Sequence, residues 1–294
     1  MNLLLDPDAH PVIGHRGASG LAPENTLQSF ALALEQGADA LEFDVRLTAD
    51  GVPVVLHDPT LGRTCDRNEP LEALSAAALA EADAGYHFSA GGASRPFRGR
   101  RIGIPRVADV LEQFPETPLL IEVKEVRAAR PLAGLIRERG AAGRVVVASF
   151  LEEALQPFYE APAIPTGASR QGILRLWLAA MTGFPAPRAR YRAYAVPDRF
   201  RDRIHVPTAR FIRAARRAGC PVHVWSVDDP ERARYLWEQG AAGVITNFPA
   251  EMVQKRRALS LQPSALSHQS LKAAGCRLKG EGLKATPPAH RPLF

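Results

Sequence analysis

The chain has 294 residues, of which 46% are hydrophobic and 23% charged, a composition typical of a soluble globular protein that can bury a large core. Its formal net charge of +6 lies mostly in one segment, because the residues from Leu259 onward contain five Lys and Arg and one Glu and so carry +4 of it. The rest of the chain is close to neutral and has no recognisable nucleic-acid reading motif, so we expect no nucleic-acid partner.

The chain begins MNLLLDPDAHP, in which no basic residue precedes the leucines, so we predict no secretory signal peptide. No run approaches the roughly 18 apolar residues that a membrane-spanning helix requires. Cys65, Cys220 and Cys276 are far apart and odd in number, which indicates neither a disulfide framework nor a zinc site. Together these features predict a cytoplasmic protein.

Short apolar runs alternate with helical patterns from residue 11 to about residue 255. Thr208 is predicted to open a helix that ends near Gly219. Asp229 is a favourable N-cap, with Pro230 in the first helical position. The predicted strands are residues 11–14, 40–46, 119–124, 145–149, 163–168, 192–196, 222–227 and 243–246.

Eight strand and helix units in succession predict a parallel sheet that closes into a (β/α)8 TIM barrel. An open, doubly wound sheet is the alternative, and it is weakened because neither GxGxxG nor GxxxxGK[ST] occurs. We assign residues 1–258 to the barrel domain. Residues 259–294 contain Ser, Pro, Gly and Lys without apolar periodicity, so we predict a disordered basic tail.

One segment interrupts the repeat. VPVVLHD at 52–58 follows strand 40–46 after the short turn TADG, and it is either an added hairpin or a barrel strand without its helix. Residues 60–105 contain GYHFSAGGASRPFRGRR, which is rich in Gly, Ser and Arg. We therefore expect an irregular insertion that emerges from the barrel mouth after the His57 segment.

Two predicted strands carry charged side chains on the face that normally points inward. In LEFDV, Glu42 and Asp44 share one face and the apolar residues take the other, and Glu122 and Lys124 do the same in LIEVK. Buried charges are costly unless a metal, a partner charge or an ionic substrate compensates them. The pattern therefore indicates a functional site rather than a scaffold.

Further candidates stand at predicted strand ends, where a parallel barrel builds its active site. GHRG places His15 and Arg16 after the first strand, and His57 with Asp58 closes VPVVLHD. The three carboxylates form a hard oxygen site that suits Mg²⁺ or Ca²⁺ better than zinc. Arg16 and Lys124 suit phosphate, and two histidines can serve as an acid and base pair. This combination indicates phosphodiester cleavage.

These residues belong to a longer pattern. A close resemblance to the glycerophosphodiester phosphodiesterases lies in HRGASGLAPENTLQSFALALEQGADALEFDVRLTADGVPVVLHDPTLGRT and continues through IPRVADVLE, LIEVK, VVVASF, VHVWSVDDP and GAAGVITNFP. It spans about residues 11–252, leaving out the tail and much of 60–100 and 160–205. The resemblance implies a (β/α)8 barrel.

The resemblance also implies roles for individual residues. It implies that His15 and His57 act as general acid and base. The carboxylates that match the family's metal ligands are Glu42, Asp44 and Glu122, so the implied cofactor is a divalent cation, Mg²⁺ or Ca²⁺.

The substrate contacts follow from the same resemblance. Arg16 and Lys124 match positions that contact the phosphate, and Trp225 matches a tryptophan that can pack against the glycerol. A buried core position is an equally good interpretation of Trp225. The family often has Asp in place of Asn247 and Thr in place of Ser226, which affects local hydrogen bonding rather than activity.

The sequence therefore predicts a metal-dependent enzyme that hydrolyses small-molecule glycerophosphodiesters to sn-glycerol 3-phosphate and an alcohol, with either water or the glycerol 2-hydroxyl as nucleophile. Lysophospholipase D type cleavage of lysophospholipids is one alternative. A non-catalytic phosphate-binding barrel is another, disfavoured because every catalytic position is filled. The leaving alcohol, Mg²⁺ against Ca²⁺, the division of labour between the histidines and the oligomeric state are open at this point.

Two segments bear on substrate size and membrane contact. Residues 186–217 contain ten Arg and two Asp, which form either solvated surfaces or a field that attracts an anionic substrate or surface. The preceding helical segment is apolar nearly all round, so it either lies under a neighbouring helix or a dimer partner, or receives an acyl chain or a membrane surface at the mouth. One face of it consists of Ile173, Leu174, Trp177, Leu178 and Met181.

Overall fold

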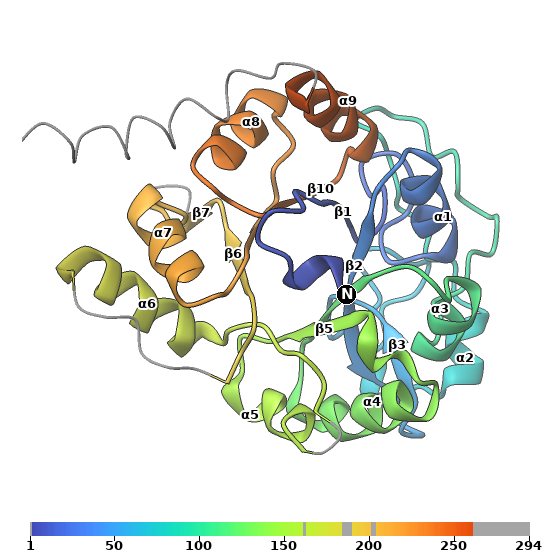
Figure 1. The fold of residues 1–294 in the computed structure, drawn as a ribbon. Coiled ribbons are helices and arrows are strands. Elements are labelled where there is room, and N and C mark those ends of the chain that lie inside the picture. The colour runs from blue at the N-terminus through green and yellow to red at the C-terminus, as the bar shows by residue number, and fades with distance from the viewer. Residues whose placement is uncertain (1, 161–162, 184–189, 201–203, 261–294) are drawn as a thin grey trace, which may run out of the picture. The chain divides into compact units, whose positions relative to one another are not determined.

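The computed structural model (Figure 1) describes residues 2–160, 163–183, 190–200 and 204–260, with helices arranged around a parallel sheet. The sheet runs in the spatial order β5-β4-β2-β1-β10-β9-β6. Its strands are β1 (Val12–His15), β2 (Ala40–Leu47), β4 (Leu119–Val123), β5 (Val145–Ala148), β6 (Tyr194–Pro197), β9 (Val222–Trp225) and β10 (Gly243–Thr246). The helices outside it are α1 (Leu27–Glu35), α3 (Val107–Gln113), α4 (Val126–Glu138), α5 (Glu152–Leu155), α6 (Arg170–Thr182), α7 (Ala209–Arg217), α8 (Pro230–Glu238) and α9 (Pro249–Ser260).

The gap between β5 and β6 is closed by two residues rather than by a full strand. Thr166 forms a parallel bridge to β5, and Gly167 forms one to β6. The strand expected at 163–168 is wrong in its length, because Pro165 has no N–H with which to continue a ladder of hydrogen bonds. The predicted TIM barrel is confirmed, and this short connection takes the place of its eighth strand.

Apolar side chains of the strands pack outward against the helices, as their alternation predicts. Leu41, Phe43 and Val45 of β2 are fully buried in the largest core cluster. The ring of Phe43 lies 5.5 Å from that of Phe30 on α1. Because these residues take the outer face, Glu42 and Asp44 between them point into the barrel.

The floor of the barrel is closed by the N-terminal segment. The short helix η1 (Leu3–Leu5) crosses the barrel end nearest the viewer in Figure 1, and Leu4 is buried among interior residues that include Ile13 and Ile245. Inside this floor, Nε2 of His223 donates a hydrogen bond to the Leu4 carbonyl over 2.9 Å. Burial lowers the pKa of His223 to about 4, so it is neutral near pH 7.

The segment VPVVLHD forms an added hairpin, which decides between the two interpretations left open by the sequence. β2 extends three residues beyond Asp44, and β3 (Pro53–Val55) returns antiparallel to it, with Val55 opposite Val45. The chain therefore rises above the barrel rim and folds back. This return brings His57 down to the level of the inward carboxylates.

The insertion after His57 is mostly irregular but has a small core of its own. It contains η2 (Leu71–Ala73) and α2 (Ala76–Ala80), and Leu61, Leu79 and Ile104 are buried within it. The Asp83 carboxylate accepts hydrogen bonds from the backbone N–H groups of Gly85, Gly99 and Ile102. A single buried carboxylate thus ties together a loop that has little regular structure.

The side-chain caps predicted for two helices are present. Thr208 caps α7 and Asp229 caps α8. Cys65 and Cys220 are buried and free. None of the helices in the described part of the chain is long and apolar enough to cross a bilayer. The remaining short elements lie in the connections after other strands. They are η3 (Ala141–Gly143), η4 (Gln156–Phe158), β7 (Arg199–Phe200) and β8 (Ile204–His205).

Helix α9 continues to Ser260, slightly past the predicted end of the barrel domain at residue 258. Residues up to Arg256 belong to one compact unit. The rest of the predicted basic tail, residues 261–294 with Cys276, lies outside the described residues, so its predicted disorder stays a prediction.

Candidate active site

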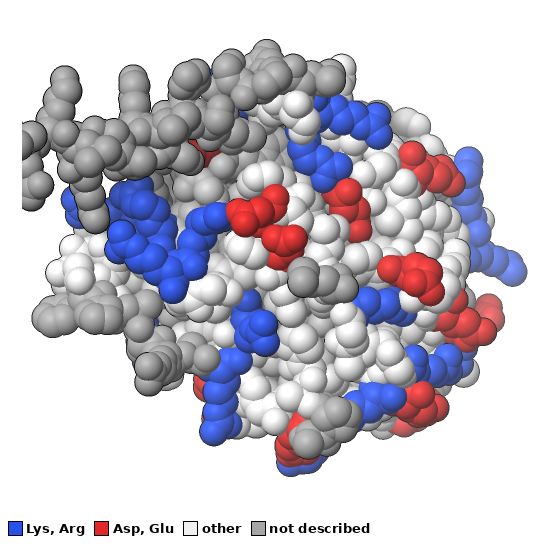
Figure 2. Space-filling view, in the orientation of Figure 1, with Lys and Arg blue, Asp and Glu red and all other residues white. Residues whose placement is uncertain are grey.

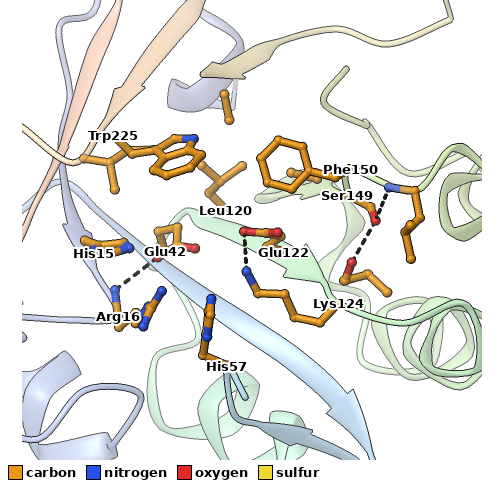
Figure 3. A pocket seen from close by; sticks show the side chains of 15 residues that line it. His15, Arg16, Glu42, His57, Leu120, Glu122, Lys124, Ser149, Phe150 and Trp225 are labelled. Atoms are coloured by element: carbon orange, nitrogen blue, oxygen red, sulfur yellow. Dashed lines mark hydrogen bonds and ion pairs between the residues drawn. The ribbon is translucent and has the colours of Figure 1, made fainter. Parts of the chain in front are cut away.

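A cavity of about 360 Å³ opens at the carboxyl ends of the strands. Figure 3 shows the charged side chains on one side of it and aromatic side chains on the other. Seven of the eight predicted site residues line it, and the exception is Asp44. The seven are His15, Arg16, Glu42, His57, Glu122, Lys124 and Trp225.

Strand register brings the three predicted carboxylates together. His15 on β1 pairs with Glu42 on β2, and Asp44 on β2 pairs with Glu122 on β4. One ligand oxygen from each of Glu42, Asp44 and Glu122 lies within 4.8 Å of the others. Asp44 is 1% exposed and Glu42 6%, so these charges are withdrawn from water.

The three carboxyl groups have very different electrostatic surroundings. Burial, together with the charges of Asp44 and Glu122, raises the pKa of Glu42 well above its usual range. Burial also raises the pKa of Glu122. Asp44 is equally desolvated, but Lys124 and Arg16 outweigh that cost and lower its pKa to about 2. Glu42 is therefore the carboxylate with the most to gain from an added cation.

Asp44 lies behind the cavity wall and holds the two cationic residues that line it. Its Oδ2 is 3.0 Å from Nε of Arg16, and its Oδ1 is 2.9 Å from Nζ of Lys124. The Asn25 amide donates to Oδ2 over 2.9 Å. Lys124 also forms an ion pair with Glu122 at 2.8 Å. One buried carboxylate thus fixes both cations at the edge of the cavity.

The backbone of the GHRG turn is held in an uncommon conformation. Arg16 has φ of 54° and Gly17 φ of 87°, both in the left-handed region. The Arg16 N–H donates to Glu42 over 3.1 Å, and its carbonyl accepts from the Asn25 N–H and the Ser29 hydroxyl, both at 3.0 Å. A Cβ on Gly17 would come within 2.6 Å of Ser29 atoms, so glycine is required there. The turn is held by several bonds at once.

His15 is oriented by a neutral amide. Its Nδ1 lies 2.7 Å from Oδ1 of Asn247, which also accepts a hydrogen bond from Ser19. The amide nitrogen of Asn247 donates to Asp228 over 2.6 Å, which fixes the orientation of the amide. Nδ1 of His15 must then be the donor, which leaves the lone pair on Nε2. Burial and the adjacent Arg16 lower the pKa of His15.

His57 is oriented by a carboxylate. Its Nδ1 lies 2.6 Å from Oδ1 of Asp58, and Asp58 forms an ion pair with Arg63. Arg63 makes two hydrogen bonds of 2.7 Å to Glu24, which in turn accepts a hydrogen bond of 2.7 Å from Arg16. This chain of charges joins the two loops that carry the histidines.

Sequence reasoning missed several members of the site. Glu24 and Asn25 lie in the PENT segment of the quoted pattern, and their polarity just after the first strand was the available signal. Arg63 carried no such signal, because its partner Glu24 is 39 residues away.

The far wall of the cavity is apolar. Trp225 and Phe150 meet edge to face with ring centroids 6.1 Å apart, and Leu120 lies between them and the carboxylates (Figure 3). Phe150 ends VVVASF, directly after a predicted strand, but was not singled out from the sequence. The site therefore offers charge to one end of a ligand and aromatic surface to the other.

Comparisons with known proteins agree with this geometry. The glycerophosphoryl diester phosphodiesterase family matches residues 15–161 and 170–251. A glycerophosphodiester phosphodiesterase of Caldanaerobacter subterraneus is 30% identical over 251 residues, covering 82% of this chain and 96% of that protein. The crystal structure of a glycerophosphodiester phosphodiesterase from Agrobacterium tumefaciens aligns with a TM-score of 0.66 at 27% identity, over 83% of this chain and 98% of that one.

A shorter match reaches a mammalian protein. A lysophospholipase D of Mus musculus is 38% identical over 113 residues, which are 38% of this chain and 33% of that protein. The full-length matches and the family match over most of the barrel agree on one assignment. The chain belongs to the glycerophosphoryl diester phosphodiesterase family.

Proposed function

We propose that this protein is a metal-dependent phosphodiesterase that hydrolyses glycerophosphodiesters to sn-glycerol 3-phosphate and an alcohol. The observation that carries the proposal is one cavity lined by two histidines, two cationic residues and two carboxylates, with the third carboxylate, Asp44, behind its wall. Family membership and the activities named for the full-length relatives support it.

The carboxylate cluster fits a hard divalent cation. Glu42, Asp44 and Glu122 supply only oxygen ligands, which Mg²⁺ and Ca²⁺ prefer. Burial and the charges of Asp44 and Glu122 raise the pKa of Glu42, a cost that a bound cation would offset. A cation bound there would neutralise phosphate charge and lower the pKa of the attacking hydroxyl.

The partners of the two histidines support different roles in proton transfer. His15 is neutral near pH 7 because its pKa is lowered, and its Nε2 lone pair can take the proton of the attacking hydroxyl, of water or of the glycerol. The carboxylate of Asp58 lies 2.6 Å from Nδ1 of His57, where it can balance the charge of an imidazolium that donates a proton. His57 then gives its proton to the alcohol oxygen as the bond from phosphorus to that oxygen breaks. If the glycerol hydroxyl is the nucleophile, a cyclic phosphate forms, and a water molecule must then open it to give sn-glycerol 3-phosphate. We therefore assign His15 as the base and His57 as the acid.

Arg16 and Lys124 bind the phosphate in this proposal. Both side chains line the cavity and are held there by Asp44, so they need little reorganisation to meet an anion. The burial of Asp44 keeps its own charge away from the substrate. Trp225 offers its ring to the apolar edge of the glycerol.

Lysophospholipase D type cleavage is the second candidate, and the apolar wall favours it. Phe150 is 39% exposed and Leu151 43% exposed, although both line the cavity. Apolar surface at a cavity rim suits an acyl chain. The shorter match to the mouse lysophospholipase D agrees with this candidate.

One set of assays separates the two candidates. Wild type, His57→Ala and the exposed control His87→Ala are incubated with glycerophosphocholine, glycerophosphoethanolamine and lysophosphatidylcholine, and sn-glycerol 3-phosphate and lysophosphatidic acid are quantified. We expect glycerol 3-phosphate from wild type and control, and a loss of about 10² to 10⁴ in rate for His57→Ala. Lysophosphatidic acid as the main product would favour the second candidate. Release of neither product, or full activity of His57→Ala, would contradict the proposed chemistry.

A further inference from the structure

Helix α6 exposes a stripe of apolar side chains to solvent. Leu174, Leu178 and Met181 are 54%, 49% and 46% exposed, and their spacing places them on one face of the helix. The opposite face, with Leu176 and Ala179, is the one that is buried. Among the described residues, nothing covers the stripe, so the packing of the barrel does not explain it.

The neighbouring helix presents arginines on its own outward face. Phe211, Ile212 and Ala215 of α7 are buried, and three arginines on the other side of that helix are exposed. Neither α6 nor α7 contains Asp or Glu. These three arginines are Arg210, Arg213 and Arg217. None of them forms an ion pair with a carboxylate of the described residues.

The two outward faces belong to neighbouring helices, since α6 packs on α7 (Figure 1). Figure 2 shows Lys and Arg side chains gathered over α7 beside uncharged side chains at the end of α6. We call this combination of the α6 stripe and the α7 arginines the α6–α7 face. It lies on the outside of the barrel and shares no residue with the catalytic cavity.

We propose that the α6–α7 face docks on the surface of an anionic lipid bilayer. Apolar side chains such as Leu174 and Leu178 can enter the boundary between headgroups and acyl chains, and arginines beside them are attracted by anionic headgroups. A second copy of the chain is a poorer occupant. A symmetric contact through this face would bring arginines together with no acidic residue on either helix to compensate them.

Co-sedimentation of the full chain with lipid vesicles tests the proposal. The vesicles contain phosphatidylcholine alone or mixed with phosphatidylglycerol. We expect binding to the mixed vesicles that weakens as salt is raised, and little binding to phosphatidylcholine alone. Leu174→Ser with Leu178→Ser, and separately Arg210→Glu with Arg213→Glu, should each weaken partitioning by about tenfold or more.

The controls separate docking from folding and from catalysis. Val126 on α4 and Tyr235 on α8 are 45% exposed, so Val126→Ser with Tyr235→Ser is a matched loss of apolar surface elsewhere and should bind like wild type. All variants should keep the wild-type melting temperature and the wild-type rate on soluble glycerophosphocholine. Because binding is measured without turnover, failure of the proposed activity would not affect this result.

Three outcomes would overturn the proposal. Wild type that does not bind the mixed vesicles excludes a lipid surface as the occupant. Undiminished binding of both double variants would assign the lipid affinity to another part of the chain. Dimers in analytical ultracentrifugation that dissociate in Leu174→Ser with Leu178→Ser would identify the face as a contact between copies.

Discussion

The two histidines of the cavity differ in what holds their Nδ1 atoms. His15 has a neutral amide partner, Asn247, whereas His57 has the carboxylate of Asp58. Burial and the adjacent Arg16 lower the pKa of His15, whose partner is neutral. The carboxylate beside His57 can balance the charge of an imidazolium that donates a proton. This asymmetry is the basis for assigning base and acid, which the sequence left open.

The assignment predicts that the two alanine variants respond differently to the leaving group. His57→Ala should lose about 10² to 10⁴ in kcat/KM on glycerophosphocholine, but far less on glycerophospho-4-nitrophenol, since nitrophenolate leaves without protonation. His15→Ala should lose activity on both substrates, because each needs a deprotonated nucleophile. The reverse pattern would exchange the two roles.

We expect Glu42 to lower the stability of the metal-free protein and to contribute to metal binding. In the metal-free protein its ionised form is buried beside Asp44 and Glu122, and its pKa is raised, so the charge opposes folding near pH 7. Glu42→Gln should therefore unfold with a free energy equal to wild type or about 1 kcal/mol higher in chelator. The same variant should lose most of the rise in melting temperature that Mg²⁺ or Ca²⁺ gives to wild type.

Differential scanning fluorimetry with and without the cations measures both effects. Glu112→Gln is the control, because the Glu112 side chain is 75% exposed and lies outside the cavity. A Glu42→Gln variant that is less stable in chelator yet fully stabilised by the cation would contradict this account.

The residues of the candidate site were largely predictable, but their connections were not. Alternation along a strand predicts that Glu42 and Asp44 point inward, and the register then places Glu122 opposite Asp44. The same pattern cannot distinguish a residue that lines the cavity from one behind it. Asp44 lies behind the wall, where one of its oxygens pairs with Arg16 and the other with Lys124. Which charged side chains pair with one another depends on distances in the folded protein, which the alternation pattern does not give.

At the level of elements, the β2–β3 hairpin is what brings the second histidine to the site. A strand that simply continued past Asp44 would carry VPVVLHD away from the cavity. The turn after Leu47 reverses the chain instead, and Nε of Arg46 donates to the His57 carbonyl over 2.7 Å. The sequence allowed either arrangement, since its turn signal and its apolar run fit both.

Two other features of the elements lay beyond sequence reasoning. Pro165 reduced an expected strand to two bridging residues, although the apolar content around it is that of a strand. In α6, periodicity showed which residues share a face, but not which face would pack. The helix buries Leu176 and exposes Leu174, an outcome that the periodicity alone does not decide.

The barrel floor predicts a pH dependence of stability through His223. Its folded-state pKa of about 4 lies below the ordinary value of 6.5, so between these pH values the unfolded chain binds more protons. The stabilisation is complete above pH 6.5 and is lost as the pH falls toward 4. The total is about 3 kcal/mol, given about 1.4 kcal/mol per pH unit.

Urea unfolding at several pH values tests this contribution. Wild type should lose stability as the pH falls through this window, and His223→Leu should show a shallower slope whatever its stability at pH 7. The exposed His87→Gln should keep the wild-type slope. Parallel slopes for wild type and His223→Leu would show that His223 does not titrate as described.

In the whole molecule, the described core and the cavity consist of residues that precede the predicted tail in the chain. The last buried core residues are Met252 and Val253, the family match ends at residue 251, and α9 ends at Ser260. A chain ending at Ser260 should therefore melt within about 1 °C of the full chain and hydrolyse glycerophosphocholine at the same rate. Insolubility or a large fall in melting temperature would show that residues 261–294 belong to the fold.

In the mechanism that we propose, one cavity combines a divalent cation with the two histidines for glycerophosphodiester hydrolysis. Its most direct test is the rate of sn-glycerol 3-phosphate release from glycerophosphocholine after exhaustive chelation, and again after Mg²⁺ or Ca²⁺ is restored. We expect chelation to lower the rate by about 10² or more, and one of the two cations to restore it in wild type but not in Glu122→Gln. Full activity in the chelated enzyme would contradict it.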